Sequence, residues 1–457
     1  MRNEKDVYGA VYRGALFPAW ERIRGRKTLD RQRDLEVSQW RSAEEIAARQ
    51  LADLRALLRH AYAHVPFYRA RFDDNGMRPD DVHELSDLLK LPLLTRPDIR
   101  ASVKERCSTA PPFPEIFKTT SGSSGKPITI AYDQGSEVWR QAVKWRSYGW
   151  AGFKPGDRVL HYWGPPQLPL PKRSKRAKIA VDRALRRELY VNCVAQADND
   201  LEEVVRTIER FAPRVIVAYA QAAGNLARFM NARGKKLARQ IPIICTAEQL
   251  VASDREQIEQ AFGPEIYNSY GGRETMLLAM ECEAHDGLHT AAENILVEVL
   301  VTENGYMRPA RPGETGEVVV TDLHNFGSPL IRYANGDLAK MGSPARCACK
   351  RGLPKLDSIE GRVTDALQDA NGGRVQGMLF PVLMLPYADA VRQYQAVQHK
   401  DRSVTLRIVP SPLFKPQVED LLRGNIERAI RGVPVKVDLV DEIPPAISGK
   451  QRLIVIE

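Results

Sequence analysis

The chain has 457 residues, 43% hydrophobic and 27% charged, which is ordinary for a globular protein of two or more domains. No apolar run approaches the roughly 20 residues that span a bilayer, the N-terminus lacks the apolar core of a secretory signal, and six cysteines are too few for a disulfide scaffold. We therefore expect a cytoplasmic protein. The net charge of +10 fits polyphosphate ligands, anionic membranes, acidic carrier proteins or nucleic acid, without choosing among them.

The first 110 residues are predicted to be mostly helical. In residues 42–65 apolar side chains recur every three or four positions, Ser42 is the expected N-cap, and Pro66 is expected to end the helix. The segment LPLLTRPDI (91–99) is predicted to be a short extended piece leading to a turn.

From residue 117 onward, strand-like runs alternate with helices, which predicts a layered α/β architecture. A β-rich part follows, in which Gly-containing turns separate the runs. The expected strands are 156–164, 214–220 and 241–250, and the expected helices are 200–212 and 253–263, the latter with Ser253 as N-cap.

After residue 361 the composition changes, and a strand–helix–strand pattern predicts a small separate α+β domain. The boundary is expected near Arg362, between a large part (1–361) and this small α+β domain (362–457). No internal repeats stand out.

A loop rich in glycine and hydroxyl side chains follows a strand-like run near residue 119. Its glycines allow the backbone to approach an anion, and its amides, hydroxyls and lysine supply donors and positive charge. It lacks the spacing of a Walker loop, so a phosphate cradle and a flexible linker both remain open. The loop comprises Thr119, Thr120, Ser121, Gly122, Ser123, Ser124, Gly125 and Lys126.

Four shorter motifs follow in the chain. Tyr270 and Gly271 precede Glu274, so one turn offers an aromatic ring and a carboxylate that suits Mg²⁺. Asp337 follows a Gly turn and can accept ribose hydroxyls, and Arg362 can reach ribose or phosphate. Near the C-terminus, Lys450 lies on a Gly loop that a mobile domain can deliver and withdraw.

In this order, the five motifs resemble the adenylate-forming superfamily, and most closely its phenylacetate–CoA ligase-like branch, which includes the CapK type. The stretches 37–72, 91–99 and 327–339 resemble the same branch. The resemblance implies ATP-dependent activation of a carboxylic acid, with aryl or arylacetic acids expected, and transfer of the acyl group to a thiol, expected to be coenzyme A.

The resemblance further implies a large multi-subdomain adenylation domain (1–361) and a small mobile α+β C-terminal lid (362–457). It also assigns roles to individual residues. The loop 119–126 would hold the ATP phosphates, and Lys450 would contact the carboxylate and the α-phosphate. The remaining assignments are Tyr270 and Glu248 beside the adenine, Glu274 on Mg²⁺, and Asp337 and Arg362 on the ribose.

Two positions depart from the family pattern. Arg273 stands where Thr or Ser usually precedes the glutamate; it could contact a phosphate or the acid, or pair with Glu274 and weaken metal binding. Thr364 stands at the usual hinge aspartate, with Asp365 next to it, which puts the pivot of the lid in question.

A cysteine–histidine pattern suits a structural tetrahedral Zn²⁺ site with four ligands. Some members of the branch resemble this chain in carrying such a cluster, and His289 is favoured over His285. Free thiols and surface histidines are the alternative. The five candidates are Cys282, His285, His289, Cys347 and Cys349.

The stretch 171–188 combines basic and apolar residues at helical spacing, so it is either a solvated helix or a peripheral contact with a membrane or an acidic partner. His161, Tyr162 and Trp163 close a strand and are either core or part of an acid pocket.

The main hypothesis is therefore an acid–thiol ligase. Its alternative is an adenylating enzyme that feeds a carrier protein or a polysaccharide acceptor. A nucleic-acid partner is not expected. Nothing in the sequence sets an oligomeric state.

Overall fold

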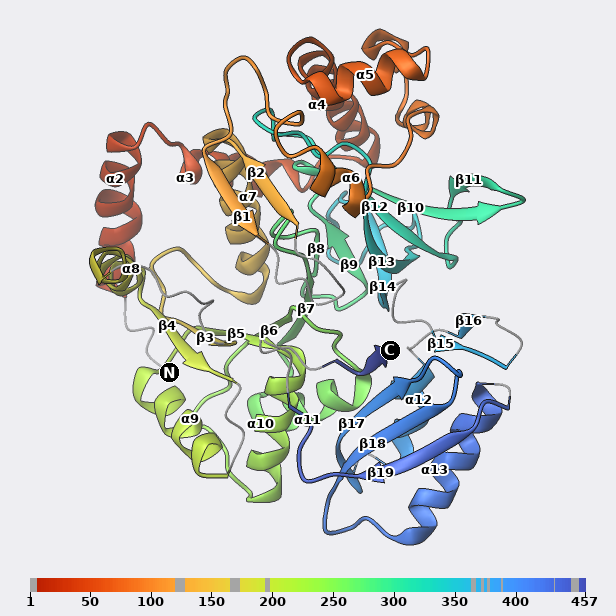
Figure 1. The fold of residues 1–457 in the computed structure, drawn as a ribbon. Helices are drawn as coiled ribbons and strands as arrows, with labels where there is room; N and C mark the ends of the chain where they lie inside the picture. Colours follow the sequence, from red (N-terminus) through yellow and green to blue (C-terminus); the bar gives the residue numbers. More distant parts are fainter. Residues whose placement is uncertain are drawn as a thin grey trace.

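The computed structural model describes residues 6–119, 128–164, 173–193, 198–362, 367–370, 374–375, 379–387, 389–430, 432–444 and 452–457. Its centre is a twelve-stranded mixed sheet in the order β11-β10-β12-β13-β14-β9-β8-β7-β6-β5-β3-β4, with helices packed around it (Figure 1). A smaller sheet lies towards the C-terminus. The α/β class expected from the sequence is confirmed.

The N-terminal part is helical. Ser42 and Glu45 form a reciprocal capping box, so α4 begins where the sequence predicted, and it ends before Pro66, which starts the next helix. Its helices are α1 (Val7–Val11), the π-turn η1 (Tyr12–Leu16), α2 (Phe17–Ile23), α3 (Thr28–Ser38), α4 (Ala43–His64), α5 (Pro66–Asp74), α6 (Arg96–Ala101) and the 3₁₀ turns η2 (Pro79–Asp81) and η3 (Leu85–Lys90).

One half of the large sheet is parallel. Its strands are β4 (Glu188–Asn192), β3 (Val159–Trp163), β5 (Val215–Tyr219), β6 (Ile243–Thr246) and β7 (Ile266–Tyr270). The helices of this half are α7 (Gln134–Tyr148), η4 (Gly149–Ala151), α8 (Arg173–Arg186), α9 (Asp198–Phe211), α10 (Ala220–Ala232) and α11 (Ala252–Phe262).

The predicted cap of α11 is wrong. The helix begins at Ala252 and its N-cap is Val251, so Ser253 already lies inside the first turn. Tertiary contacts hold this start, because buried Asp254 accepts a hydrogen bond from Arg228 Nη1 of α10 at 2.6 Å.

The other half of the large sheet is antiparallel, and a separate hairpin, β1 with β2, leads into α7. The strands are β1 (Ile116–Thr119), β2 (Thr129–Tyr132), β8 (Ala279–Glu281), β9 (Leu288–Thr290), β10 (Ile295–Glu303), β11 (Tyr306–Pro309), β12 (Thr315–Asp322), β13 (Tyr333–Met341) and β14 (Lys355–Arg362).

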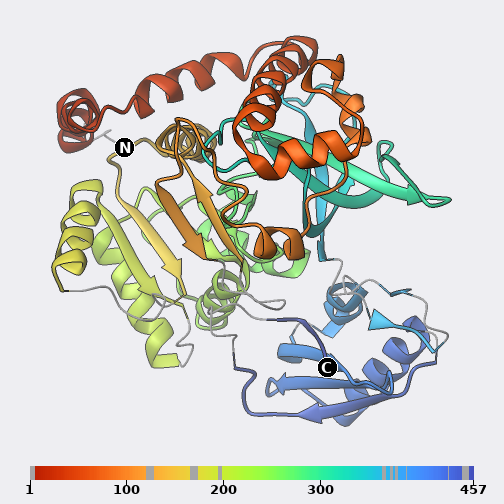
Figure 2. The ribbon, with the colours of Figure 1, turned by 45° about the horizontal axis from the view of Figure 1, so that its top comes forward.

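The C-terminal residues form a unit with its own sheet, ordered β19-β18-β17-β20, which Figure 2 shows beside the larger part. Leu406 and Ile408 of this sheet pack with Leu422 and Ile426 of α13, so the unit has its own core. Its elements are β15 (Leu367–Gln368), β16 (Arg374–Val375), α12 (Leu379–Met384), η6 (Leu385–Tyr387), β17 (Val391–Gln398), β18 (Val404–Pro410), α13 (Pro416–Ala429), β19 (Val435–Leu439) and β20 (Ile454–Ile456). Among the described residues, no helix has the length and apolar character needed to cross a membrane.

Candidate active site and cysteine–histidine cluster

The large sheet changes from parallel to antiparallel pairing at β7, which ends at Tyr270. Gly271 follows in a tight turn, where a Cβ atom would lie 2.0 Å from the carbonyl oxygen of Met276. Only glycine fits this approach, which closes the turn through the Met276 N–H donating to Gly272 O at 2.7 Å. The turn places Glu274 beyond the carboxyl end of the strand, where open α/β sheets bind ligands.

Three side chains converge beside Tyr270. Its hydroxyl donates to Asp337 Oδ2 at 2.7 Å and accepts from Asn335 Nδ2 at 2.7 Å. The Arg362 Nε lies 3.2 Å from the other oxygen, Asp337 Oδ1. Burial raises the pKa of Tyr270, and the Asp337 carboxylate raises it further, so the phenol remains a donor at neutral pH. The structure thus brings together three residues that the sequence assigned to one nucleotide site.

Glu274 is held by residues that the sequence analysis missed. Arg96 Nη2 lies 3.4 Å from Glu274 Oε1, and the Tyr333 hydroxyl lies 3.5 Å from the same oxygen. Arg140 Nη1 donates to the Glu274 backbone carbonyl at 2.6 Å. The buried Arg140 also pairs with Asp322. The side-chain contacts of Glu274 are long, so a hard cation could compete for its carboxylate.

The extended segment before α6 delivers Arg96 to this site. Leu94 N donates to Arg332 O at 2.8 Å, and Ala334 N donates back to Leu94 O at 3.0 Å. Arg96 then begins α6, which Thr95 caps. The sequence predicted an extended piece over 91–99 that leads to a turn. This prediction is wrong for residues 96–99, which already belong to α6 because Thr95 caps that helix, and it said nothing about the partner strand.

Arg273 contacts the backbone at the start of the Gly-Ser loop. Its Nη1 donates to the carbonyl oxygen of Thr119 at 2.7 Å, at the point where β1 leads into the Gly-Ser loop. Glu248, beyond the end of β6, accepts from the backbone N–H of Gln221 at 3.2 Å, so it too lies at the carboxyl edge of the parallel strands. The rest of the loop, 120–126, lies outside the described residues, as do Thr364, Asp365 and Lys450.

Four of the five candidate metal ligands form one cluster. Cys282, His289, Cys347 and Cys349 have ligand atoms within 4.8 Å of one another. The Cys282 and Cys347 sulfurs lie 3.7 Å apart, close to the about 3.8 Å that two thiolates at about 2.3 Å from a tetrahedral Zn²⁺ would show.

The imidazole of His289 faces the cluster with its Nε2 atom. Its Nδ1–H donates to the Leu353 carbonyl at 2.9 Å, which leaves Nε2 3.2 Å from the Cys349 sulfur. His285 lies outside the cluster, with its Nδ1 3.3 Å from Glu281 Oε2. The donor set and its orientation fit zinc.

The cluster joins three parts of the large domain. Cys282 follows β8, His289 belongs to β9, and Cys347 and Cys349 lie between β13 and β14. Arg351 extends the junction to the N-terminal helices, since its Nε donates to Gln39 Oε1 at 2.9 Å. A metal here would tie β8 and β9 to the connection between β13 and β14, which Arg351 links in turn to the end of α3.

The three residues at the end of β3, His161, Tyr162 and Trp163, differ in how deeply they are buried. Tyr162 is buried in the core, whereas His161 stacks on Tyr190 with ring centroids 4.3 Å apart, and Trp163 contacts Tyr219 at 4.5 Å. Burial lowers the pKa of His161 to about 3, so its ring is neutral at physiological pH.

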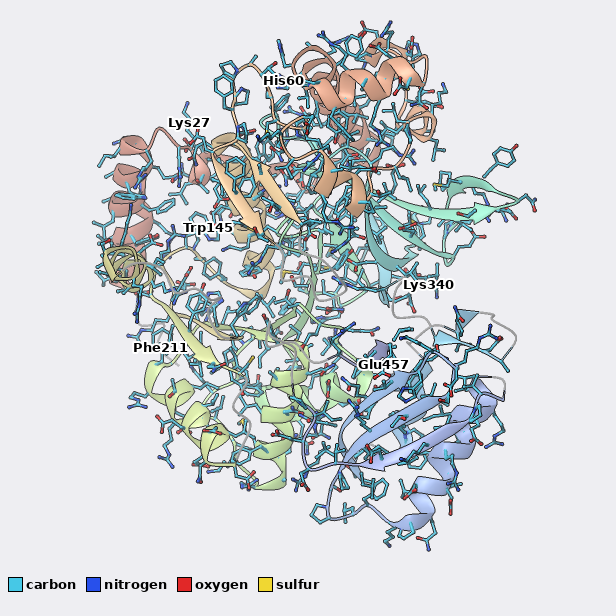
Figure 3. All side chains as sticks on the ribbon, in the orientation of Figure 1. Lys27, His60, Trp145, Phe211, Lys340 and Glu457 are labelled. Atoms are coloured by element: carbon cyan, nitrogen blue, oxygen red, sulfur yellow. The ribbon has the colours of Figure 1, made fainter. Side chains whose placement is uncertain are left out.

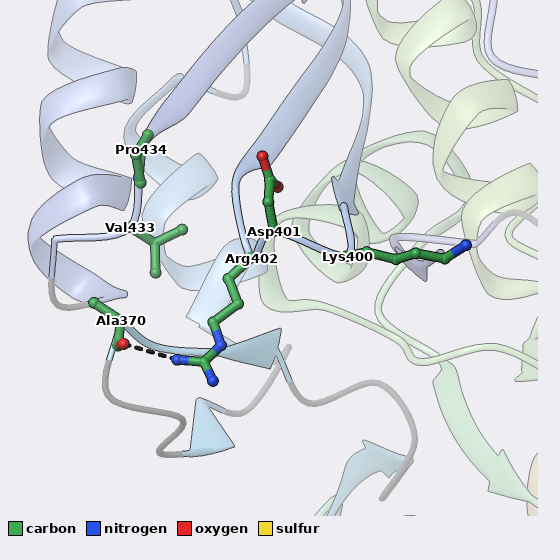
Figure 4. Close-up of a pocket in the computed structure, with 6 residues that line it drawn as sticks. All are labelled: Ala370, Lys400, Asp401, Arg402, Val433 and Pro434. Atoms are coloured by element: carbon green, nitrogen blue, oxygen red, sulfur yellow. Dashed lines mark hydrogen bonds between the residues drawn. The ribbon is translucent and has the colours of Figure 1, made fainter.

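A separate open pocket of about 400 Å³ lies on the C-terminal unit (Figure 4). Arg402 donates to the Ala370 carbonyl at 2.8 Å across it. None of its lining residues belongs to the candidate nucleotide site. They are Ala370, Lys400, Asp401, Arg402, Val433 and Pro434.

Comparison with solved structures identifies the class of fold. The chain superposes on 2-hydroxyisobutyryl-CoA ligase in complex with an acyl-AMP with a TM-score of 0.72 at 19% identity, covering 92% of this chain and 91% of the other. It superposes on the anthranilate CoA ligase AuaEII with a TM-score of 0.53 at 16% identity, covering 73% of this chain and 64% of the other. The fold is that of the adenylate-forming CoA ligases.

Curated relatives narrow the class. The chain is 30% identical to phenylacetate–coenzyme A ligase of Escherichia coli over 335 residues, which is 71% of this chain and 73% of the relative. It is 27% identical to the enzyme of the same name from Thermus thermophilus, over 90% and 96% of the two chains. Protein CapK of Staphylococcus aureus is 22% identical over 85% and 84%. Residues 367–457 match the CapK C-terminal domain model.

This chain belongs to the phenylacetate–coenzyme A ligase family. The resemblance predicted from the five motifs is thereby confirmed, and so is the enzyme class, an AMP-forming acid–CoA ligase.

Proposed function

We propose that this protein activates an aryl or arylacetic acid with ATP, releasing pyrophosphate, and transfers the acyl group from the acyl-adenylate to the thiol of coenzyme A. The observation that carries the proposal is the convergence of Tyr270, Asp337 and Arg362 beside the Glu274 turn. The names of the relatives in Escherichia coli and Thermus thermophilus support the acid class.

The chemistry assigned to the site is positioning and charge neutralisation. Asp337 accepts the ribose hydroxyls while Arg362 holds its other oxygen, and Tyr270 packs near the adenine, with Glu248 beside it. The loop 119–126 holds the phosphates, and its entry is fixed by the bond from Arg273 to Thr119. Mg²⁺, when bound to Glu274, neutralises charge on the phosphates.

We assign Lys450 to the first half-reaction, formation of the acyl-adenylate, and not to the second, transfer of the acyl group to the thiol. A carboxylate and the α-phosphate repel each other, and an ammonium group between them lowers that repulsion during in-line attack. We assign residues 362–457 to a lid that brings Lys450 to the α-phosphate and then withdraws it to admit the thiol.

A structural Zn²⁺ bound by Cys282, His289, Cys347 and Cys349 is part of the proposal. The distances within the cluster and the fixed tautomer of His289 support it. A closed site of four protein ligands leaves no open position for substrate, so the metal would stabilise rather than react.

We keep a second acceptor as an alternative proposal, in which the adenylate passes to a carrier-protein thiol or a polysaccharide acceptor instead of coenzyme A. Residues 367–457 match the CapK C-terminal domain model, whose description names no acceptor. The acid activation step is the same in both cases.

The decisive experiment is ATP–pyrophosphate exchange with purified protein across a library of carboxylic acids, followed by acyl-CoA detection with the best acid. Exchange stimulated by aryl or arylacetic acids and formation of the thioester are expected. Exchange without acyl-CoA formation would favour the second acceptor. No exchange with any acid would refute the proposed function.

A further inference from the structure

Residues 7–23 form one continuous helical rod, and the outer face of this rod is apolar. The backbone stays helical from α1 through η1 into α2, a length of roughly 25 Å. Val7 is 69% exposed and Ile23 78% exposed, and further apolar side chains lie between them. These are Val11 at 47%, Leu16 at 46% and Trp20 at 40% exposure.

The charged residues of the rod do not interrupt this face. Between Val7 and Trp20 the one charged residue is Arg13, which turns inward to donate to the Pro155 carbonyl at 3.0 Å. Glu21 is buried and accepts from the backbone N–H of Thr28 at 2.5 Å. The opposite face of the rod packs into the core through Tyr12 and Phe17.

Helix α8 lies at the foot of this rod, at the left edge of the molecule in Figure 1. The Tyr8 hydroxyl donates to the Leu185 carbonyl at 2.6 Å, and Arg187 Nη1 pairs with Asp6 at 2.8 Å, so the two elements are in direct contact. Helix α8 adds a second exposed apolar stripe, which includes Val181 at 59% and Leu185 at 52% exposure.

The surroundings of these apolar stripes are basic. Residues 6–27 and 173–187 together contain twelve basic and three acidic residues. The acids are Asp6, which pairs with Arg187, Asp182, which pairs with Arg186 at 3.1 Å, and the buried Glu21. Exposed cations include Arg22 and Arg24 at the end of the rod, and Arg176 and Lys178 on α8. Lys27, which is labelled in Figure 3, is a further exposed cation just beyond the rod.

We propose that the outer faces of Val7–Ile23 and α8 dock this enzyme onto an anionic membrane surface. Apolar side chains in a helix face would enter the headgroup boundary while the surrounding arginines and lysines meet anionic lipids. An exposed apolar face of this length marks an interaction site. A second copy is a poorer occupant, because the same basic rim would face itself across a symmetric interface.

The test is sedimentation of the full-length protein with vesicles, without ATP or acid, so that it is independent of the proposed ligase activity. One set contains phosphatidylglycerol and phosphatidylcholine, and the other phosphatidylcholine alone. We expect at least about tenfold stronger binding to the anionic set, weakened by high salt. Two double variants test the two surfaces: Leu16→Ser combined with Ile23→Ser, and Arg176→Glu combined with Lys178→Glu. Each should lower the partition of the protein onto anionic vesicles at least about tenfold.

Leu413→Ser with Leu421→Ser provides the matched control, because these leucines are 63% and 55% exposed on the C-terminal unit. This variant should bind anionic vesicles like the parent protein. Circular dichroism and light scattering on every variant establish folding and mass. The proposal is overturned if the parent protein does not bind anionic vesicles, or if neither the rod variant nor the α8 variant weakens binding. It is also overturned if the parent protein is a dimer that dissociates in the Leu16/Ile23 variant.

Discussion

The hydroxyl of Tyr270 donates to Asp337 Oδ2 at 2.7 Å, although the two residues belong to strands four places apart in the order of the large sheet. The bond links the last parallel strand, β7, to β13 in the antiparallel half. It also aligns the carboxylate, whose second oxygen faces Arg362 at 3.2 Å. The two halves of the sheet therefore meet at the group proposed to hold the ribose.

Replacing Asp337→Asn should raise the KM for ATP at least about tenfold, because a hydrogen bond to a charged group contributes about 1.5–3 kcal/mol. Tyr270→Phe removes only the hydroxyl group and keeps the aromatic ring, so its effect should be smaller. Pyrophosphate exchange at varied ATP measures both. An unchanged KM in the Asp337 variant would contradict the ribose assignment.

Replacing Lys450→Ala should abolish most adenylation while thiol transfer from supplied acyl-adenylate survives, since the ammonium is needed where carboxylate meets α-phosphate. Separate assays of the two half-reactions test this. Lys436→Ala, an exposed lysine on β19, is the control and should retain both. Equal loss of both half-reactions in the Lys450 variant would refute the role.

Replacing Gly271→Ala should disorder the Glu274 turn, because the new Cβ would lie 2.0 Å from the Met276 carbonyl. We expect a lower melting temperature and at least about a hundredfold loss of exchange activity, since misplaced groups lose most of their catalytic effect. Gly424→Ala in α13 is the control, because a Cβ atom at that position would have nothing within 4 Å. Normal activity in the Gly271 variant would argue against the importance of this turn.

Purified protein should contain about one zinc per chain, measured by elemental analysis, and Cys282→Ala should lose it. The free energy of unfolding should then fall by about 3 kcal/mol or more, because metal binding is coupled to folding. Cys193→Ala, at a buried cysteine outside the cluster, is the control for the loss of a thiol. A full zinc content in the Cys282 variant would contradict the ligand set.

Stability should fall as the pH drops below about 6.5, the pKa of an unfolded histidine. Burial lowers the pKa of His324 to about 4 in the folded protein, where its ring stacks on Trp139. The unfolded chain therefore binds a proton at this histidine that the folded chain does not bind. For this one group, the free energy of unfolding falls by about 1.4 kcal/mol for each pH unit between these two pKa values.

Replacing His324→Gln should make the loss of stability with acid shallower by about this amount per pH unit. Chemical denaturation between pH 7 and about 4.5 provides the measurement. His83→Gln, at an exposed histidine, should leave the slope unchanged. The same slope in the parent and in the His324 variant would show that another group controls the acid sensitivity.

Local patterns in the sequence determined the helices, the strands and the family. The capping box at Ser42, the alternation of strand-like and helical runs, and the order of the five motifs are all encoded within short windows. They suffice because capping and hydrophobic periodicity depend on neighbours a few residues away. Two predictions were wrong. The cap at Ser253 was misplaced, since contacts between α10 and α11 set that helix start, and residues 96–99 were expected to be extended but begin α6.

Tertiary structure decided which distant residues meet. Arg96 reaches Glu274 because Leu94 pairs with the Arg332–Ala334 backbone, and His289 faces the thiols because the Leu353 carbonyl fixes its ring. The apolar face from Val7 to Ile23 likewise emerges only when Tyr12 and Phe17 take the buried side of the rod. Such relationships follow from the order of strands in a sheet and the packing of helices, which depend on contacts made across the whole chain.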